Sequence, residues 1–263
     1  MNRTFKFIII TVFGFLLYAF LSTKYFSILN TEIDNIIHFR IFSYLLAYLI
    51  LGGPIFIALF ILHPSGNILE SLGINKNLIR GIVVAFLFAL PMLIGYSIFF
   101  NLNTELTLEK VFIGSVFAAL FEELYFRGFL FGQVFRNTKL GFIPAILLGA
   151  VLFGLGHLHQ SNDFATLIGI FLVTAMGSAI FAWLYVEWNY NLWIPIGLHF
   201  FMNLHWTLFS AGENALGGTT ANIFRIITII ASIVGTIVYK KRRKTSYGIN
   251  KGNVWMRTDY NTI

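Results

Sequence analysis

Long apolar runs separated by short polar breaks dominate the pattern of the chain. Each run approaches the roughly 20 apolar residues that a helix needs to cross the hydrocarbon core of a bilayer. The pattern predicts an all-α, polytopic membrane protein, with one transmembrane domain over residues 1–244 and a polar, loosely ordered tail over 245–263. About eight transmembrane helices are expected, near residues 5–23, 37–62, 79–100, 111–135, 142–158, 164–187, 191–209 and 222–239.

The composition agrees with this class. Of 263 residues, 57% are hydrophobic and only 11% are charged, whereas about 25% of an ordinary soluble domain is charged. The first run is long for a signal peptide and lacks a small-x-small cleavage site, so we expect it to be retained. The absence of cysteine excludes disulfides, thiolate metal sites and a cysteine nucleophile.

The net charge of +7 indicates orientation rather than nucleic-acid binding. Five basic residues, 240–244, directly follow the last apolar run. With eight spans, 13 basic residues fall on the side of the two termini and 4 fall on the other side or near it. Because cytoplasmic loops carry an excess of Lys and Arg, both termini are predicted to be cytoplasmic.

Charged residues inside the fourth run are the main chemical signal. Each of Glu122, Glu123 and Arg127 costs about +2.5 to +3.5 kcal/mol at the centre of a membrane helix unless it faces protein or water. Glu123 and Arg127 are four residues apart and can form an ion pair on one helix face. Glu122 points about 100° away, which leaves its carboxylate free for general acid–base chemistry.

Two later runs add imidazoles at membrane depth. His157 follows Phe153 by four residues, and His199 precedes Asn203 by one helical turn. Taken singly, these features fit a buried ion pair and packing histidines equally well, and packing is the expectation for His38, His63, His159 and His205. Glu, His, His and Asn on three separate helices together form a plausible hydrolytic set.

These three motifs resemble the signature EExxxR, FxxxH and HxxxN of the CAAX protease and bacteriocin-processing (Abi) family. This family includes the type II CAAX prenyl endopeptidases and the lysostaphin-resistance-protein-A-like intramembrane proteases. The resemblance rests on Glu122-Glu123 with Arg127, on Phe153 with His157 and on His199 with Asn203, and it covers residues 110–210.

The resemblance implies an intramembrane endopeptidase with a cavity open to the cytoplasm and the bilayer, in a bacterial cell membrane. Glu122 and His157 would activate a water, while His199 and Asn203 would donate hydrogen bonds to the oxyanion. Glu123 and Arg127 would support them. The substrate would be a membrane-associated peptide or protein, such as a prenylated CAAX-box protein or a bacteriocin leader. No nucleic-acid partner is expected, and the sequence assigns no oligomeric state.

Whether the protein uses a metal is left open by the resemblance, because members of the family are often labelled metalloendopeptidases. A Zn²⁺ ion would take Glu122, His157 and His199 as ligands. The chain has no HExxH motif, and binding of Glu122 to zinc would leave no evident base. We therefore favour a mechanism without a metal cofactor.

Two alternatives remain at the level of sequence, namely a proton-coupled transporter and a catalytically silent immunity or scaffold protein. The depth of the histidines is the geometric difficulty. At about 1.5 Å per residue, His199 lies about 8–12 Å from the cytoplasmic start of its helix, whereas Glu122 and His157 lie about 20 Å from theirs. Their convergence therefore requires that helix tilt, a longer seventh helix or a recessed cavity remove about 10 Å.

Overall fold

The computed structural model describes residues 2–64 and 66–258, and the regular structure in this part of the chain is helical. An isolated antiparallel bridge between Leu140 and Met256 is the one pairing of extended residues described. The predicted all-α architecture is confirmed. The helices are α1 (Arg3–Ile37), α2 (Arg40–Leu51), α3 (Gly53–Leu62), α4 (Ile68–Leu72), α5 (Leu78–Phe99), α6 (Leu108–Val111), the π-helix η1 (Phe112–Phe117), α7 (Ala118–Glu122), the π-helix η2 (Glu123–Phe131), α8 (Gly132–Asn137), α9 (Phe142–Gly156), the 3₁₀-helix η3 (Leu158–Gln160), α10 (Phe164–Glu187), α11 (Trp193–Leu208) and α12 (Thr219–Arg243).

Within the described residues, five helical segments are long and apolar enough to cross a membrane. They are α1, α5, α9 with η3, α10 and α12. Helices α2 and α3 meet at a 43° bend and together form a sixth candidate. The two other predicted spans correspond to α11, which has 16 residues, and to the continuous helical run from α6 to α8, which carries the charged motif. The multi-pass character is confirmed, and the count of eight stays a prediction.

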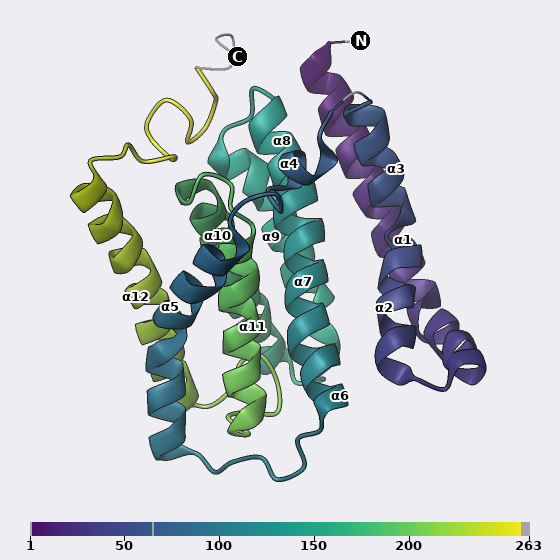
Figure 1. Cartoon of the computed structure of the whole chain (residues 1–263), viewed down its shortest axis with the longest axis vertical. Coiled ribbons are helices and arrows are strands. Elements are labelled where there is room, and N and C mark those ends of the chain that lie inside the picture. Colours follow the sequence, from purple (N-terminus) through teal and green to yellow (C-terminus); the bar gives the residue numbers. More distant parts are fainter. Residues whose placement is uncertain (1, 65, 259–263) are drawn as a thin grey trace.

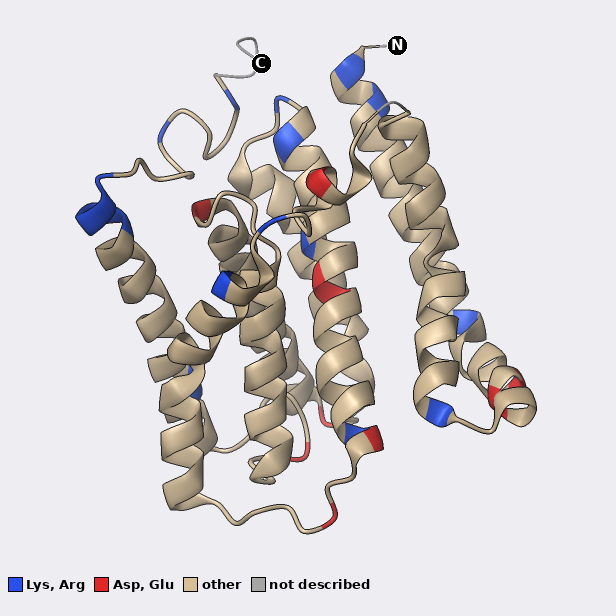
Figure 2. Ribbon diagram, viewed as in Figure 1, with Lys and Arg blue, Asp and Glu red and all other residues tan. Residues whose placement is uncertain are grey.

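The long helices alternate in direction, so that the start of α1 and the end of α12 lie toward the same end of the bundle (Figure 1). Lys and Arg residues gather toward this end, including the basic run that closes α12 (Figure 2). The positive-inside rule requires one end of the bundle to carry more Lys and Arg residues than the other. Assignment of the basic end to the cytoplasm stays a prediction.

Helix α1 is longer than predicted. It continues from the apolar run 5–23 to Ile37 and is about 52 Å long at 1.5 Å per residue. The extension packs against α2, where the Phe26 ring lies 4.8 Å from that of Tyr48. The helix ends at His38, whose left-handed backbone (φ 54°) donates its N–H to the Asp34 carbonyl.

The run from α6 to α8 lies in the middle of the molecule. One side packs against α1 and α3, where Phe15 and Ile55 share a buried cluster with Tyr125 and Phe129. The Tyr125 hydroxyl donates to the Tyr48 carbonyl at 2.9 Å, beside the bend between α2 and α3. This packing leaves the opposite side of the central run for α9, α10 and α11, which carry the other motifs.

Helix α11 begins deeper in the bundle than the level at which α8 ends (Figure 1). After α10, the left-handed residues Asn189 and Tyr190 (φ 56° and 57°) turn the chain back inward. The Leu192 N–H then donates to the carbonyl of Gly73 at 3.2 Å. Gly73 is itself left-handed (φ 81°), and a Cβ there would overlap the Tyr190 carbonyl oxygen. The recessed start of α11 brings His199 to the depth of Glu122, which removes the predicted mismatch.

The prediction of a loose C-terminal tail is wrong for residues 245–258. The backbone N–H groups of Gly248 and Ile249 donate to the Glu187 carboxylate at 3.0 and 2.9 Å. Arg257 donates to the Phe135 carbonyl at 2.9 Å. The polar composition of the segment did not predict this docking, because the docking depends on a distant carboxylate, buried at the end of α10, that accepts backbone N–H groups of the segment. The rest of the predicted tail, 259–263, lies outside the described residues.

Candidate active site

The charged motif lies where the central helical run changes from α-helix to π-helix. Glu122 ends α7 and Glu123 begins η2, whose backbone continues with bonds between residues five apart, as from the Gly132 N–H to the Arg127 carbonyl. Short π-helical segments are rare and frequently mark functional sites. Here the change directs Glu123 into the protein interior, where its side chain is fully buried, while the Glu122 side chain is 28% exposed.

The predicted ion pair of Glu123 and Arg127 is present. Arg127 Nη1 lies 3.1 Å from Glu123 Oε1, and both side chains are completely buried. The guanidinium lies 4.5 Å from the ring centroid of Phe153 and 5.5 Å from that of Phe181. Such cation–π contacts stabilise a buried cation. Phe153 of the second motif therefore packs directly on Arg127 of the first.

His199 is held by Glu123, a contact between helices that the sequence did not reveal. Its Nδ1 lies 2.8 Å from Glu123 Oε1, and its Nε2 lies 3.9 Å from Glu122 Oε2. Glu123 was expected to serve Arg127 alone, and in the structure it also orients the imidazole. With Nδ1 donating to Glu123, the Nε2 atom faces Glu122.

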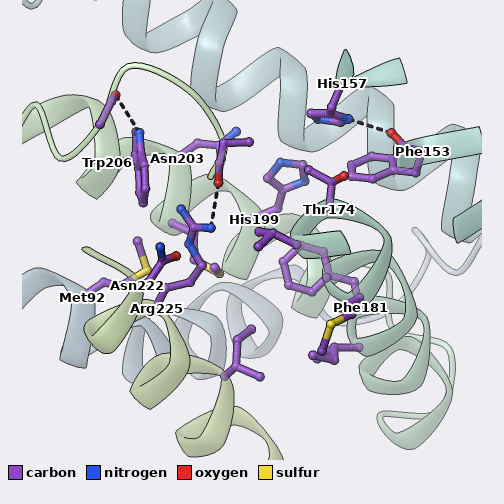
Figure 3. Close-up of a pocket in the computed structure, with 18 of the residues that line it drawn as sticks. Met92, Phe153, His157, Thr174, Phe181, His199, Asn203, Trp206, Asn222 and Arg225 are labelled. Carbon is purple, nitrogen blue, oxygen red and sulfur yellow. Dashed lines mark hydrogen bonds between the residues drawn. The ribbon is translucent and has the colours of Figure 1, made fainter. Parts of the chain in front are cut away.

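His157 lies at the C-terminal end of α9, in the same cavity as His199 (Figure 3). Its Nδ1 lies 2.7 Å from the Phe153 carbonyl oxygen. Because a carbonyl only accepts, Nδ1 carries the proton, and in the neutral ring Nε2 is left as an acceptor. Among the described residues, His157 forms no hydrogen bond with Glu122, so these two groups share the cavity without a direct contact.

Asn203 lies one turn beyond His199 on α11, as the spacing predicts. Its Nδ2 donates one hydrogen bond, to the Gly114 carbonyl of η1 at 3.1 Å. The second N–H of the amide and its carbonyl oxygen remain for other partners. Of the four histidines predicted to be packing residues, His63 bonds Gln133 at 2.7 Å and His205 is buried, and neither these nor His38 and His159 line the cavity.

A cavity of about 840 Å³ joins the motif residues. Glu122, His157, His199 and Asn203 all line it, together with apolar side chains of α5, α10 and α12 (Figure 3). Met176 of α10 and Ile226 and Ile230 of α12 line it and are also 64%, 56% and 52% exposed. The cavity therefore opens sideways between α10 and α12, both of which are candidate membrane spans.

The resemblance implies a cavity that opens to the cytoplasm, but the cavity in the structure extends toward the other end of the bundle. Residues 212–215, which connect α11 to α12, line it there. This connection lies at the end of the bundle opposite to the basic end of α12 (Figures 1 and 2). The opening toward the bilayer thus agrees with the resemblance. The far end of the cavity does not, because the residues that line it lie on the side predicted to be external.

The donor set is a poor fit to zinc. Among the described residues, no group of three or more His, Asp or Glu side chains converges as metal ligands. His199 Nδ1 bonds Glu123 and His157 Nδ1 bonds a carbonyl, so Nε2 of each ring is the atom that a metal would use. A tetrahedral site formed by Glu122, His157 and His199 would require all three to approach one point within about 2.1 Å.

Comparison with known proteins places the motifs in a recognised segment. Residues 104–205 match the family model described as type II CAAX prenyl endopeptidase Rce1-like. A Bacillus subtilis (strain 168) protein named "Putative membrane peptidase YdiL" is 34% identical over 93 residues, which is 35% of this chain and 34% of the relative. No solved structure matches.

The aligned region spans about a third of the length of this relative. The segment matched by the family model contains Glu122 to Arg127, Phe153 to His157, and His199 to Asn203. The resemblance predicted from these motifs is therefore confirmed over residues 104–205. Together with the apolar helices, the likenesses support a membrane protease.

Proposed function

We propose that this protein is an intramembrane endopeptidase that hydrolyses a peptide bond of a membrane-associated peptide, such as a prenylated or leader peptide. The observation that carries the proposal is the arrangement of Glu122 and His199. Their side chains come within 3.9 Å of each other at the wall of a cavity that opens toward lipid, and Glu123 fixes the imidazole from behind.

In this proposal Glu122 is the general base. It takes a proton from a water molecule, and the water oxygen attacks the scissile carbonyl. His157 Nε2 accepts a hydrogen bond from the other O–H of that water, because Nδ1 is already bound to the Phe153 carbonyl. Glu122 then transfers its proton to the departing nitrogen as the C–N bond breaks, which gives a carboxylic acid and an amine. The proton of the acid passes to the amine, so that the products are a carboxylate and an ammonium group.

The negative charge of the tetrahedral intermediate needs donors. His199, doubly protonated with Nδ1–H on Glu123 and Nε2–H directed into the cavity, and the free N–H of Asn203 supply them, on the same face of α11. Glu123 acts through His199 and is a positioning residue. This division of roles uses no metal, in keeping with the donor set around Glu122.

The cavity also suggests the chemical class of the substrate. Its volume of about 840 Å³ lies in the range of ligand-binding pockets, and apolar residues such as Met92, Phe181 and Met202 line it. A peptide with apolar side chains fits this lining, and the gap between α10 and α12 gives it a route from the bilayer.

A peptide library tests the proposed activity. The purified protein in liposomes is incubated with apolar peptides, and the products are identified by mass spectrometry. The wild-type protein and Glu105→Gln, a substitution in an exposed loop, are expected to produce fragments, while Glu122→Gln lowers the rate by about 10²- to 10⁴-fold. Equal cleavage by Glu122→Gln, or no cleavage by the wild-type protein, would overturn the proposal.

A further inference from the structure

We propose that Arg225 forms an anion-binding subsite at the far end of the cavity and takes a carboxylate of the peptide substrate. This inference rests on the proposed function. Arg225 lies in the second turn of α12, a candidate membrane span, and its side chain is half-buried and lines the cavity. A charge in such a helix normally has a specific partner or a functional role.

The contacts of Arg225 leave its charge without a counter-ion. Nη1 donates to the Ala215 carbonyl at 2.8 Å, and the guanidinium lies 4.3 Å from the centroid of a Trp206 ring. Among the described residues, no carboxylate forms an ion pair with it. Glu213 lines the same cavity and yet makes no ion pair with Arg225 in the structure. The planar guanidinium has five N–H donors and suits bidentate binding of a carboxylate.

Among the described residues, the two buried cations differ from half-buried Arg225 in this respect. Arg127 is paired with Glu123, and Lys240 is paired with Glu187. Both of those charges are therefore compensated by a carboxylate of the protein. Arg225 alone among the three combines an unpaired charge with access to the cavity.

The connection between α11 and α12 closes over Arg225. Its backbone is fixed by Trp206, which donates to the Gly212 carbonyl at 3.0 Å, and by Gln160, which accepts from the Ala215 N–H at 2.7 Å. Asn222 donates to the Leu216 carbonyl at 2.9 Å. This cover favours an anion that already lies inside the cavity over a lipid headgroup that approaches from the end of the bundle.

The subsite lies within reach of the proposed chemistry. His199 faces Glu122, and Trp206, seven residues further along α11, contacts Arg225. Seven residues of α-helix rise about 10 Å, a distance that one short extended peptide can span. Figure 3 shows Arg225 and Trp206 on the opposite side of the pocket from His157. A carboxylate bound by Arg225 would also be kept away from the negative charge of Glu122.

Two pairs of peptides test the subsite. An N-acetylated six-residue peptide of alternating leucine and alanine is compared as its C-terminal carboxylate and its C-terminal carboxamide. A second pair, both amidated, carries either glutamate or glutamine as the last residue. Equilibrium binding to the wild-type protein in detergent micelles is measured together with cleavage, so that the subsite is tested even without turnover. We expect one carboxylate of the two pairs to bind about 10- to 100-fold more tightly than its amide. The pair that shows the preference identifies the source of the carboxylate.

Arg225→Gln is expected to abolish this preference, and Arg225→Lys to retain part of it. Arg136→Gln is the matched control, because Arg136 is also half-buried and donates to backbone carbonyls but does not line the cavity, and this variant should keep the preference. Glu213→Gln should also keep it. Equal binding of acid and amide by the wild-type protein, or an unchanged preference in Arg225→Gln, would overturn the inference. Loss of the preference on adding phosphatidylglycerol, without loss on adding phosphatidylcholine, would assign Arg225 to lipid phosphate and also overturn it. A preference that depends on Arg225 without any cleavage would retain the subsite and reject the peptidase.

Discussion

Two buried ion pairs stand at different levels of the bundle, and the groups around them differ. Glu187 and Lys240 pair near the end of α10, where the carboxylate also accepts two backbone N–H groups and Lys240 also donates to the Ser246 carbonyl. Glu123 and Arg127 pair in the central helix, beside the cavity. There, Glu123 Oε2 and Glu122 Oε2 accept no hydrogen bond from the described residues, and the guanidinium contacts Glu123 Oε1 through Nη1 alone, at 3.1 Å.

The comparison shows how a structural ion pair differs from one beside the proposed reactive site. Buried polar atoms are normally satisfied, so a cluster of unsatisfied ones requires an explanation. The pair of α10 and α12 is satisfied by the docked C-terminal segment and has no access to the cavity. The pair of the central helix is incompletely satisfied and orients His199. A buried charge alone therefore says little, and the remaining hydrogen-bonding capacity around it indicates function.

The largest difference between the two pairs is expected in stability. Arg127→Met leaves Glu123 buried with only His199 as a partner, and should lower the free energy of unfolding by about 3–5 kcal/mol. Lys240→Met leaves Glu187 with two backbone donors and should cost only about 1–3 kcal/mol. Unfolding of both variants by denaturant in mixed micelles measures the losses. Equal losses would contradict the distinction between the two pairs.

Removing both charges of the central pair separates folding from catalysis. In the double variant Glu123→Gln with Arg127→Met, no uncompensated charge remains, so stability should recover to within about 1.5 kcal/mol of the wild-type value. The imidazole of His199 loses its anionic partner, and a misplaced catalytic group costs about 10²-fold in kcat/KM. The measurement is cleavage of the best library peptide by variants of matched folded fraction. Wild-type kcat/KM in the double variant would show that Glu123 does not position His199.

Lys240→Met should have a smaller, local effect on the C-terminal segment. Without the ammonium, the segment that also binds Glu187 should dissociate more often, and trypsin should cut faster after Lys251. The kcat should stay within about twofold of the wild-type value, because this pair lies outside the cavity. Limited proteolysis followed by mass spectrometry measures the first effect. Unchanged proteolysis would mean that the other contacts of the segment suffice to hold it.

Chelation is expected to have the smallest effect. Since three metal ligands do not converge at Glu122, incubation with EDTA followed by dialysis should leave kcat/KM unchanged. Metal content measured on the same sample provides the control. Loss of cleavage with EDTA and recovery with added Zn²⁺ would reject the mechanism without a metal.

The sequence predicted a set of candidate residues that line one cavity in the structure, but not their contacts. Apolar runs predicted the helices, because a span must satisfy its backbone internally, and α10 matches its predicted range, 164–187. Helical spacing correctly paired Glu123 with Arg127. It could not show that Glu123 also binds His199, since that contact joins residues 76 positions apart on different helices.

Two further features had no adequate signal in the sequence, and a third had a signal that was not used. The π-helical turns of η1 and η2 have no recognisable local sequence pattern. Docking of residues 245–258 depends on a buried acceptor at Glu187, distant in the chain. Arg225 was visible as a charge near the end of an apolar run, and a search for unpaired charges inside spans would have selected it.

The most direct test follows the hydrolytic water itself. A library peptide that the protein cleaves is incubated with it in H₂¹⁸O under single-turnover conditions, and the new carboxylate is analysed by mass spectrometry. The account predicts one ¹⁸O atom in that carboxylate for the wild-type protein and almost no product for Glu122→Gln at an equal folded fraction. Product of the same amount and isotope content from Glu122→Gln would contradict the assignment of Glu122 as the base.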